Sequence, residues 1–291
     1  MNDINNRKNF NPEKRGKDIE NIKLGISHGD INGIGYEVML KCFSDNRMFD
    51  FCTPILYGSS KIASYHKKLI NATDFPFVNI RSVEQAEPNK FNILNIIQEE
   101  VKIDIGQPTE IGGKLAAMSL DIACRDLMNG KIDALVTNPI NKKNIQSDKF
   151  NFPGHTEYLT KMFGVDESLM IMTCNKLHIG IMTNHLSLSQ VPQVITKELI
   201  LRKLKVMNDS LKRDFGIRMP KIAVLALNPH AGDRGLIGEE DDAIVTPAIQ
   251  EAFDKGILVF GPYPADGFFG NGTMKDFDGV MALYHDQGLI P

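Results

Sequence analysis

The chain has 291 residues, of which 42% are hydrophobic and 24% charged, and its formal net charge is −3. These values are typical of a soluble globular protein long enough for two domains, and they argue against a basic nucleic-acid-binding surface. Because no apolar stretch approaches the roughly 20 residues of a membrane span, and the four cysteines form no C-x-x-C pair, we expect a cytoplasmic protein without a thiolate metal site.

Strand-like and helix-like patterns alternate along the chain after a flexible, mixed-charge tail at residues 1–20. Short apolar runs predict buried strands, and apolar residues three or four apart predict helices. The expected strands lie at 22–27, 53–58, 77–80, 132–140, 169–182 (two strands), 222–227 and 280–283, and the expected helices near 36–43, 59–70, 109–130, 156 and 196–216. This alternation predicts an α/β protein with two α/β/α domains and mostly parallel sheets, at about residues 21–145 and 146–291.

A glycine-rich segment, GDINGIGYE, connects the first expected strand to the first expected helix. Its glycines, Gly29, Gly33 and Gly35, do not match the G-x-G-x-x-G fingerprint of dinucleotide-binding folds, and no convincing acidic ribose partner follows. We therefore interpret the segment as a tight turn that could approach a ligand through backbone amides. Residues that bind a nucleotide cofactor cannot be assigned from it.

His155 and Thr156 lie in the segment FPGHTEYL, at the start of an expected helix. Free backbone N–H groups and the helix dipole favour an anion at such a place. A substrate phosphate or carboxylate would suit it. The alternative is simple capping, with Thr156 as the N-cap and His155 exposed.

Three histidines, His185, His230 and His285, each follow a short apolar run that is typical of a buried strand. In open α/β sheets, ligands bind outside the carboxyl ends of the strands. Three imidazoles there could bind one ion, and zinc with three protein ligands and an open position is a known catalytic arrangement. Each histidine alone is equally well explained as a polar loop residue, but the three together favour a metal site.

Two carboxylates lie near these histidines in the sequence. Asp286 follows His285, and Asp266 lies in the segment GPYPADGFF. Either one could orient an imidazole or act as an additional ligand. The alternative for Asp266 is a turn former after Pro264.

Other conspicuous residues are expected to be structural. His66 lies among lysines on an expected helix, and we predict that it is solvated. His28 and His178 belong to no recognisable constellation. The acidic run at 238–242 opens a helix, where the helix dipole favours negative charge.

Five segments in order resemble one family. GDINGIGYE, GHTEYL, NPHAGDRGLIGEE, GPYPADGFF and YHDQGLIP resemble motifs of the 4-hydroxythreonine-4-phosphate dehydrogenases of pyridoxal phosphate biosynthesis. The resemblance implies a fold like those of isocitrate and isopropylmalate dehydrogenases and a homodimer whose active site lies between domains and subunits. It departs from the family where Ile31-Asn32 replace Pro-Ala and Tyr36 replaces Pro.

The resemblance also implies roles for the candidate residues. His185, His230 and His285 would bind a divalent metal (zinc, with magnesium or cobalt as alternatives), His155 and Thr156 would contact substrate, and Asp266 would lie close to the reacting centre. Family members usually run on for several dozen residues, which supply a lysine, an asparagine and an arginine to the substrate phosphate. No counterparts of these residues precede Pro291, so the resemblance implies that the family's C-terminal segment is missing here.

The implied reaction is oxidation of 4-phosphooxy-L-threonine by NAD or NADP, followed by loss of CO₂ to give 3-amino-2-oxopropyl phosphate. The metal would lower the pKa of the substrate hydroxyl, and Asp266 or a water would accept its proton. A related dehydrogenase of 4-phosphothreonate or 4-phosphoerythronate is an alternative. A further alternative, from another class, is a metal-dependent hydrolase or lyase, or a metal-binding protein, that uses no nicotinamide.

Overall fold

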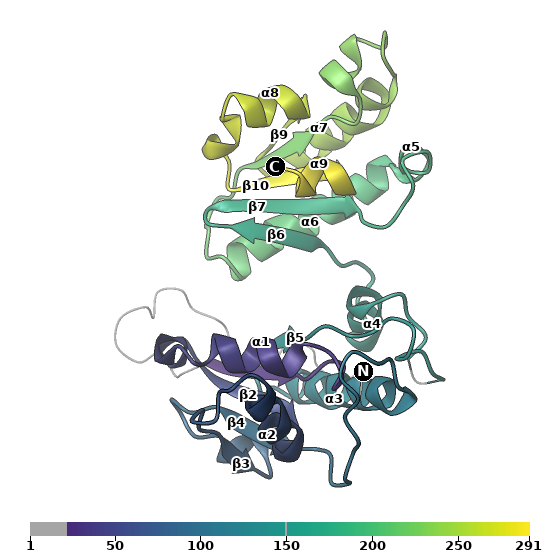
Figure 1. The fold of residues 1–291 in the computed structure, drawn as a ribbon. Helices are drawn as coiled ribbons and strands as arrows, with labels where there is room; N and C mark the ends of the chain where they lie inside the picture. Colours follow the sequence, from purple (N-terminus) through teal and green to yellow (C-terminus); the bar gives the residue numbers. More distant parts are fainter. Residues whose placement is uncertain (1–21, 149) are drawn as a thin grey trace. The chain divides into compact units, whose positions relative to one another are not determined.

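The computed structural model describes every residue except 1–21 and 149, and its contacts divide the chain into two compact units (Figure 1). The first unit ends at Gly164 and the second begins at Val165. The sequence suggested an approximate boundary near residue 145, and the expected N-terminal tail lies outside the described residues.

The first unit is built on a five-stranded parallel sheet with the strand order β3–β4–β2–β1–β5. Its strands are β1 (Ile22–Ser27), β2 (Cys52–Gly58), β3 (Val78–Ile80), β4 (Asn92–Asn95) and β5 (Ala134–Thr137). Its helices are α1 (Gly35–Cys42), η2 (Asn46–Asp50), α2 (Ser60–Leu69), η3 (Val83–Gln85), α3 (Glu110–Met128) and α4 (His155–Met162).

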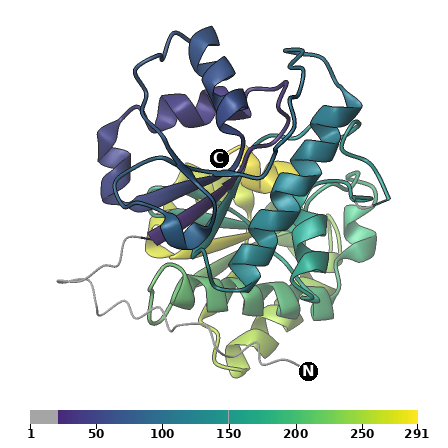
Figure 2. The same cartoon turned by 90° about the horizontal axis from the view of Figure 1, so that it is seen from below.

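Helices cover both faces of this sheet, as the alternation of side chains along β2 makes clear. Leu56 packs in a cluster with residues of α1 and α2, whereas Ile55 and Tyr57 pack in another cluster with Ala123 of α3. Successive side chains of a strand point to opposite faces, so the two clusters lie on opposite sides of the sheet. Figure 2 shows the long teal helix α3 on one side of these strands and the purple and blue α1 and α2 on the other.

Side-chain caps explain where the long helices begin. The Thr109 hydroxyl accepts a hydrogen bond from Gly112 N at the start of α3, and the Thr196 hydroxyl accepts one from Leu199 N at the start of a second long helix. Both threonines thus satisfy an N–H group that the helix leaves free. The helix starts that the sequence predicts at 109 and 196 are confirmed.

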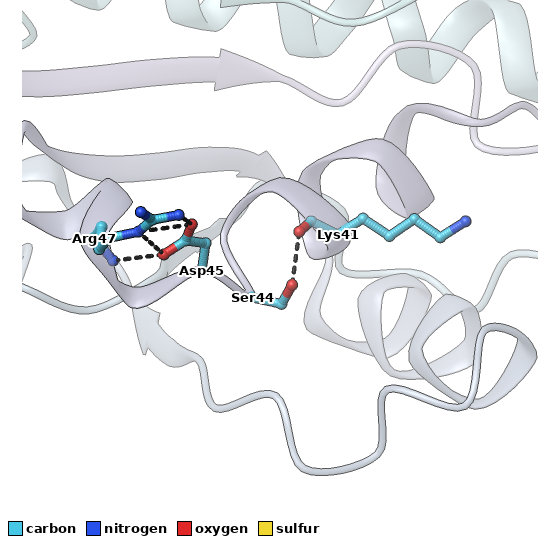
Figure 3. Close-up of polar contacts among 4 residues, drawn as sticks. All are labelled: Lys41, Ser44, Asp45 and Arg47. Carbon is cyan, nitrogen blue, oxygen red and sulfur yellow. Dashed lines mark hydrogen bonds and ion pairs between the residues drawn. The ribbon is translucent and has the colours of Figure 1, made fainter.

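The short turn between α1 and η2 is held by exposed polar contacts (Figure 3). Ser44 Oγ donates to the Lys41 carbonyl at 2.7 Å, and the Asp45 carboxylate accepts from the backbone N–H of Arg47 at 3.0 Å and from its guanidinium. Exposed ion pairs of this kind contribute little to stability. Their role here is local, because they end α1 and begin η2.

The second unit contains another five-stranded sheet, with the order β6–β7–β10–β8–β9. Neighbouring strands are parallel except β6 and β7, which are antiparallel. Its strands are β6 (Met170–Cys174), β7 (Leu177–Thr183), β8 (Ile222–Leu225), β9 (Val259–Tyr263) and β10 (Gly279–Tyr284). Its helices are α5 (Val191–Val194), α6 (Lys197–Arg213), η4 (Pro229–Asp233), η5 (Asp241–Val245), α7 (Thr246–Asp254), α8 (Ala265–Gly270), η6 (Thr273–Asp276) and α9 (His285–Leu289).

The central strand of this second sheet, β10, is also covered on both faces. Met281 packs in a cluster with Leu204 of α6, and Val280 packs in another with Phe268 of α8. All three strand residues from Met281 to Leu283 are fully buried. The expected α/β architecture with mostly parallel sheets is therefore confirmed.

Two expectations about local structure are wrong or incomplete. Strands β4 and β9 were not predicted. His66 was expected to be solvated, but it is only 2% exposed, because its ring stacks on Tyr36 with centroids 5.0 Å apart. Within the described residues, no helix is long and apolar enough to cross a membrane.

Candidate functional site

The three histidines follow the carboxyl ends of three neighbouring strands in the second unit. His185 follows β7, His285 follows β10 and His230 follows β8, and these strands are adjacent in the order β7–β10–β8. The carboxyl edge of a parallel sheet is where α/β proteins bind ligands. The chain topology thus brings all three backbones to one edge.

His185 and His285 lie closest together. Their ring centroids are 6.3 Å apart, and both rings line a small pocket of about 260 Å³. The other lining residues are Asn184, Leu186, Leu188, Tyr284 and Asp286. Asp286 Oδ1 lies 2.8 Å from Nδ1 of His285, so this carboxylate is placed to orient the imidazole.

The donor atoms in this pocket suit a borderline divalent cation. Two imidazoles line it, and Asn184 Oδ1 is buried with no hydrogen-bond partner among the described residues. Imidazole nitrogen is a good ligand for zinc, cobalt or nickel, and an amide oxygen can complete such a site. A buried oxygen without a partner is costly unless something binds it. These residues therefore fit a metal ion.

His230 lies apart from this pocket, on the η4 loop after β8. Its backbone φ is 54°, and Ala231, Asp233 and Arg234 also have left-handed φ values. Such strain in non-glycine residues concentrates at functional sites. No three His, Cys, Asp or Glu side chains in the described part of the chain form a group that could hold a metal ion. The three-histidine ligand set therefore stays a prediction.

A buried carboxylate anchors the loop that carries His230. Asp241 is fully buried and accepts hydrogen bonds from the backbone N–H groups of Leu227, at 2.7 Å, and Asn228, at 2.9 Å. The Asn228 side chain in turn donates to Glu240 at 2.8 Å. The acidic run at 238–242 does begin a helix, as expected. Two of its carboxylates, Asp241 and Glu240, also bind the segment that leads to His230.

The second candidate site lies in the first unit, at the start of α4. Gly154 is the N-cap and provides no side-chain cap, so the alternative with Thr156 as the N-cap is wrong. His155 Nε2 is buried without a hydrogen-bond partner in the described structure. Burial lowers the pKa of His155, and the nearby positive charge of Lys142 lowers it further. A neutral imidazole, a lysine and free helix N–H groups form a place for an anion.

Asp266 lies in the first turn of α8, directly after Pro264 and Ala265. Its side chain is exposed. Both its expected catalytic role and its alternative as a turn former are compatible with this position, and its role stays a prediction.

The glycine-rich turn after β1 is explained by packing. A Cβ atom on Gly29 would collide with the carbonyl oxygen of Pro139, and one on Gly35 would collide with the carbonyl oxygen of His28. Both glycines are therefore needed for close backbone contacts within the first unit. This supports the interpretation of the segment as a tight turn.

Comparison with known proteins decides the family. The profile of the family described as pyridoxal phosphate biosynthetic protein PdxA matches residues 50–291. The chain belongs to the PdxA family. A PdxA relative from Bacteroides thetaiotaomicron, named 4-hydroxythreonine-4-phosphate dehydrogenase, is 48% identical over 93% of this chain and 74% of its own length. A relative of the same name from Sulfurihydrogenibium is 37% identical over 93% of this chain and 82% of its own.

Other PdxA relatives carry another name. One from Oceanobacillus iheyensis, provisionally named D-threonate 4-phosphate dehydrogenase, is 34% identical over 92% of this chain and 81% of its own length. Among solved structures, a 4-hydroxythreonine-4-phosphate dehydrogenase from Burkholderia phymatum has a TM-score of 0.83 and 31% identity, covering 93% of this chain and 82% of that one. The PdxA fold is thus confirmed along nearly the whole chain.

Sequence reasoning missed several residues around these candidate sites. Lys142, Asn184 and Asp241 were not singled out, although Asn184 directly precedes His185 and Asp241 belongs to the acidic run. The hydrogen bonds of Asp241 to Leu227 and Asn228, and the position of Lys142 near His155, depend on contacts between separate segments. Only the position of Asn184, beside a candidate ligand, was a usable signal in the sequence.

Proposed function

We propose that this protein is a metal-dependent dehydrogenase that oxidises 4-phosphooxy-L-threonine with NAD or NADP and releases CO₂ and 3-amino-2-oxopropyl phosphate. The observation that carries the proposal is the pocket shared by His185 and His285 at a sheet edge, in a chain of the PdxA family. The name of the Bacteroides relative supports the substrate. We also propose that the active form is a homodimer with a shared site.

The proposed metal ligands are His185, His230 and His285, and zinc suits them best, with cobalt or magnesium as alternatives. When bound, a divalent cation supplies Lewis-acid stabilisation of negative charge on the substrate oxygen. The chemistry that NAD(P) supplies when bound is acceptance of the hydride from the alcohol carbon. We assign no residue to nicotinamide binding.

The side chains of the protein have their own roles in this proposal. Asp286 holds the His285 imidazole in a fixed orientation through its contact at 2.8 Å. Asp266, or a water, accepts the proton of the substrate hydroxyl. His155 and Thr156 bind an anionic group of the substrate at the start of α4, where the helix dipole and the nearby positive charge of Lys142 favour negative charge.

The activity is tested with full-length protein, Zn²⁺ and 4-phosphooxy-L-threonine, by the absorbance of reduced nicotinamide and by detection of CO₂. Turnover with NAD or NADP is expected. Metal binding without any reduced nicotinamide would contradict the proposal and favour a hydrolase, a lyase or a binding protein.

A second candidate substrate is 4-phosphothreonate or 4-phosphoerythronate. The relative from Oceanobacillus iheyensis favours it by name. The two substrates differ in an amine or a hydroxyl beside the reacting carbon. Comparison of kcat/KM for the two on the same preparation separates them, and a tenfold preference corresponds to about 1.4 kcal/mol of transition-state binding.

The metal ligands are tested by replacement of His285. We expect His285→Ala to weaken Zn²⁺ binding more than about 100-fold, because loss of a direct ligand should exceed the effect of an outer-shell change. The matched control is His178→Gln, since His178 lies near the amino end of β7 and packs on Phe215. Unchanged zinc content in His285→Ala would contradict the proposed site.

A further inference from the structure

The sheet of the second unit opens between β8 and β10 just before the histidines. Backbone pairing of the two strands runs as far as Met281 and Val224. Two residues further on, where the same register would bring Leu283 opposite Ala226, the ladder has ended. These strands carry the segments that lead to two of the proposed metal ligands.

A side chain joins the strands where the backbone no longer does. The Gln287 carboxamide accepts a hydrogen bond from Leu283 N at 2.7 Å and donates one to the Ala226 carbonyl at 2.6 Å. Gln287 is 8% exposed, and both contacts are buried. A carboxamide is suited to this bridge, because it donates and accepts at the same time. It therefore holds β8 and β10 apart at a fixed distance.

A second buried side chain joins β10 to the strand on its other side. The Thr183 hydroxyl, at the end of β7, donates to the Leu283 carbonyl at 2.7 Å. Both backbone polar groups of Leu283 are thus bound by side chains. Leu283 lies two residues before His285, and Thr183 lies two residues before His185. The three strand ends that precede the histidines are therefore fixed relative to one another.

We propose that Gln287, assisted by Thr183, is a positioning residue that sets the spacing of the strand ends carrying His185, His230 and His285, and thereby the metal affinity of the site. The inference rests on the proposed metal-dependent function. Gln287 touches neither the metal nor the substrate in this proposal. Its effect passes through the backbone, and partners that orient metal ligands typically change metal affinity 10- to 100-fold when they are lost.

The test compares Gln287→Met with the unmutated chain. Methionine has a similar length and no charge, so it removes both hydrogen bonds without placing a new ion beside the site. Metal-free full-length protein is titrated with Co²⁺ in the absence of substrate. The dissociation constant and the visible absorption spectrum of bound Co²⁺ are measured. We expect binding about 10- to 100-fold weaker, with a changed spectrum, because ligand geometry has changed.

A matched control separates positioning from a loss of stability. Thr196→Ala removes the N-cap of α6, which should cost about 1 kcal/mol of stability. The Thr196 hydroxyl accepts its hydrogen bond from Leu199 N, within α6, and so it is not one of the links between the strand ends. The Co²⁺ affinity and spectrum of Thr196→Ala should equal those of the unmutated chain. If Gln287→Met does not fold, Thr183→Val serves instead, because it removes a single link with little change of volume. It should weaken Co²⁺ binding in the same direction.

The outcomes are distinguishable. Co²⁺ binding and spectra in Gln287→Met and Thr183→Val that equal those of the unmutated chain would overturn the positioning role. Equal weakening in Thr196→Ala would also overturn it, because the effect would then follow stability alone. Absence of Co²⁺ binding by the unmutated chain would overturn the proposed metal site, and the positioning role with it.

Discussion

At the scale of single residues, three buried rings link the glycine-rich turn to helix α2. The Tyr36 ring lies between two imidazoles, with its centroid 5.7 Å from that of His28 and 5.0 Å from that of His66. The Tyr36 hydroxyl accepts from Ser59 N, and Nε2 of His66 lies 2.9 Å from the Ile31 carbonyl. Tyr36 therefore adds ring packing to the glycine-rich turn.

His28 should make the protein less stable in mild acid. Burial lowers the pKa of His28 to about 4, whereas the pKa in the unfolded chain is 6.5. The contribution of the neutral His28 ring to the free energy of unfolding is fully present above pH 6.5. It is lost as the pH falls towards 4, because the unfolded chain binds the proton first. At about pH 5 the loss should reach roughly 2 kcal/mol.

Calorimetric melting of the unmutated protein and His28→Leu at about pH 7.5 and about pH 5 measures this effect. The melting temperature of the unmutated protein should fall more between the two conditions. Burial also lowers the pKa of His66, but His66 is present in both proteins, so the difference between them isolates His28. The same fall in both proteins would contradict the prediction.

At the scale of elements, the contact of α3 with the loop after β5 reverses an expectation from helix propensity. Glycine inside a helix is usually about 1 kcal/mol less favourable than alanine, so Gly113→Ala would be expected to stabilise α3. A Cβ at Gly113, however, would collide with the carbonyl oxygen of Asn144. The Asn144 side chain donates to Asp30 and to the Thr109 carbonyl, so this loop cannot move away easily.

We therefore expect Gly113→Ala to destabilise the protein by about 1–3 kcal/mol, as overpacking does. The melting temperature checks this. Gly267→Ala in α8 is the matched control, because a Cβ there would meet no described atom within 4 Å apart from its chain neighbours and the backbone of its own helix. It should be neutral or slightly stabilising. A raised melting temperature in Gly113→Ala would contradict this expectation, because it would mean that the loop at Asn144 moves to make room for the methyl group.

The sequence predicts some helices and strands and misses others, because only some of them have a local signal. Strands with continuous apolar runs, such as β8 and β10, and helices with a threonine cap were predicted, because those signals are local. Strand β9 was missed because Gly261 and Pro262 interrupt it, and proline inside a run argues against a strand. Strand β4 is only four residues long between polar segments.

The candidate site was predictable only in part for the same reason. The position of three histidines after strands follows from the order of apolar runs. The bridge made by Gln287 does not, because it depends on the register of β8 against β10 and on where their pairing ends. The burial of His66 likewise depends on Tyr36, which is thirty residues away in the sequence.

At the scale of the whole molecule, each unit has hydrophobic clusters of its own. The clusters around Leu204 and Phe268 consist of residues from the second unit, and those around Leu56, Tyr57 and Leu120 consist of residues from the first. A domain with its own core can unfold as a cooperative unit. A substitution in the core of one unit should therefore leave the backbone amides of the other unit about as well protected from hydrogen exchange as before.

Leu204→Ala tests this independence. Leu204 is fully buried in the cluster of α6, α7 and the second sheet, so its truncation should cost about 2–5 kcal/mol. Hydrogen exchange measured by mass spectrometry should become faster in peptides of β7, β8 and β10 and stay the same in peptides of β1 and β2. Leu120→Ala, in the core of the first unit, is the matched control and should produce the reverse pattern. Equal acceleration in both units by either variant would mean that the two cores unfold together.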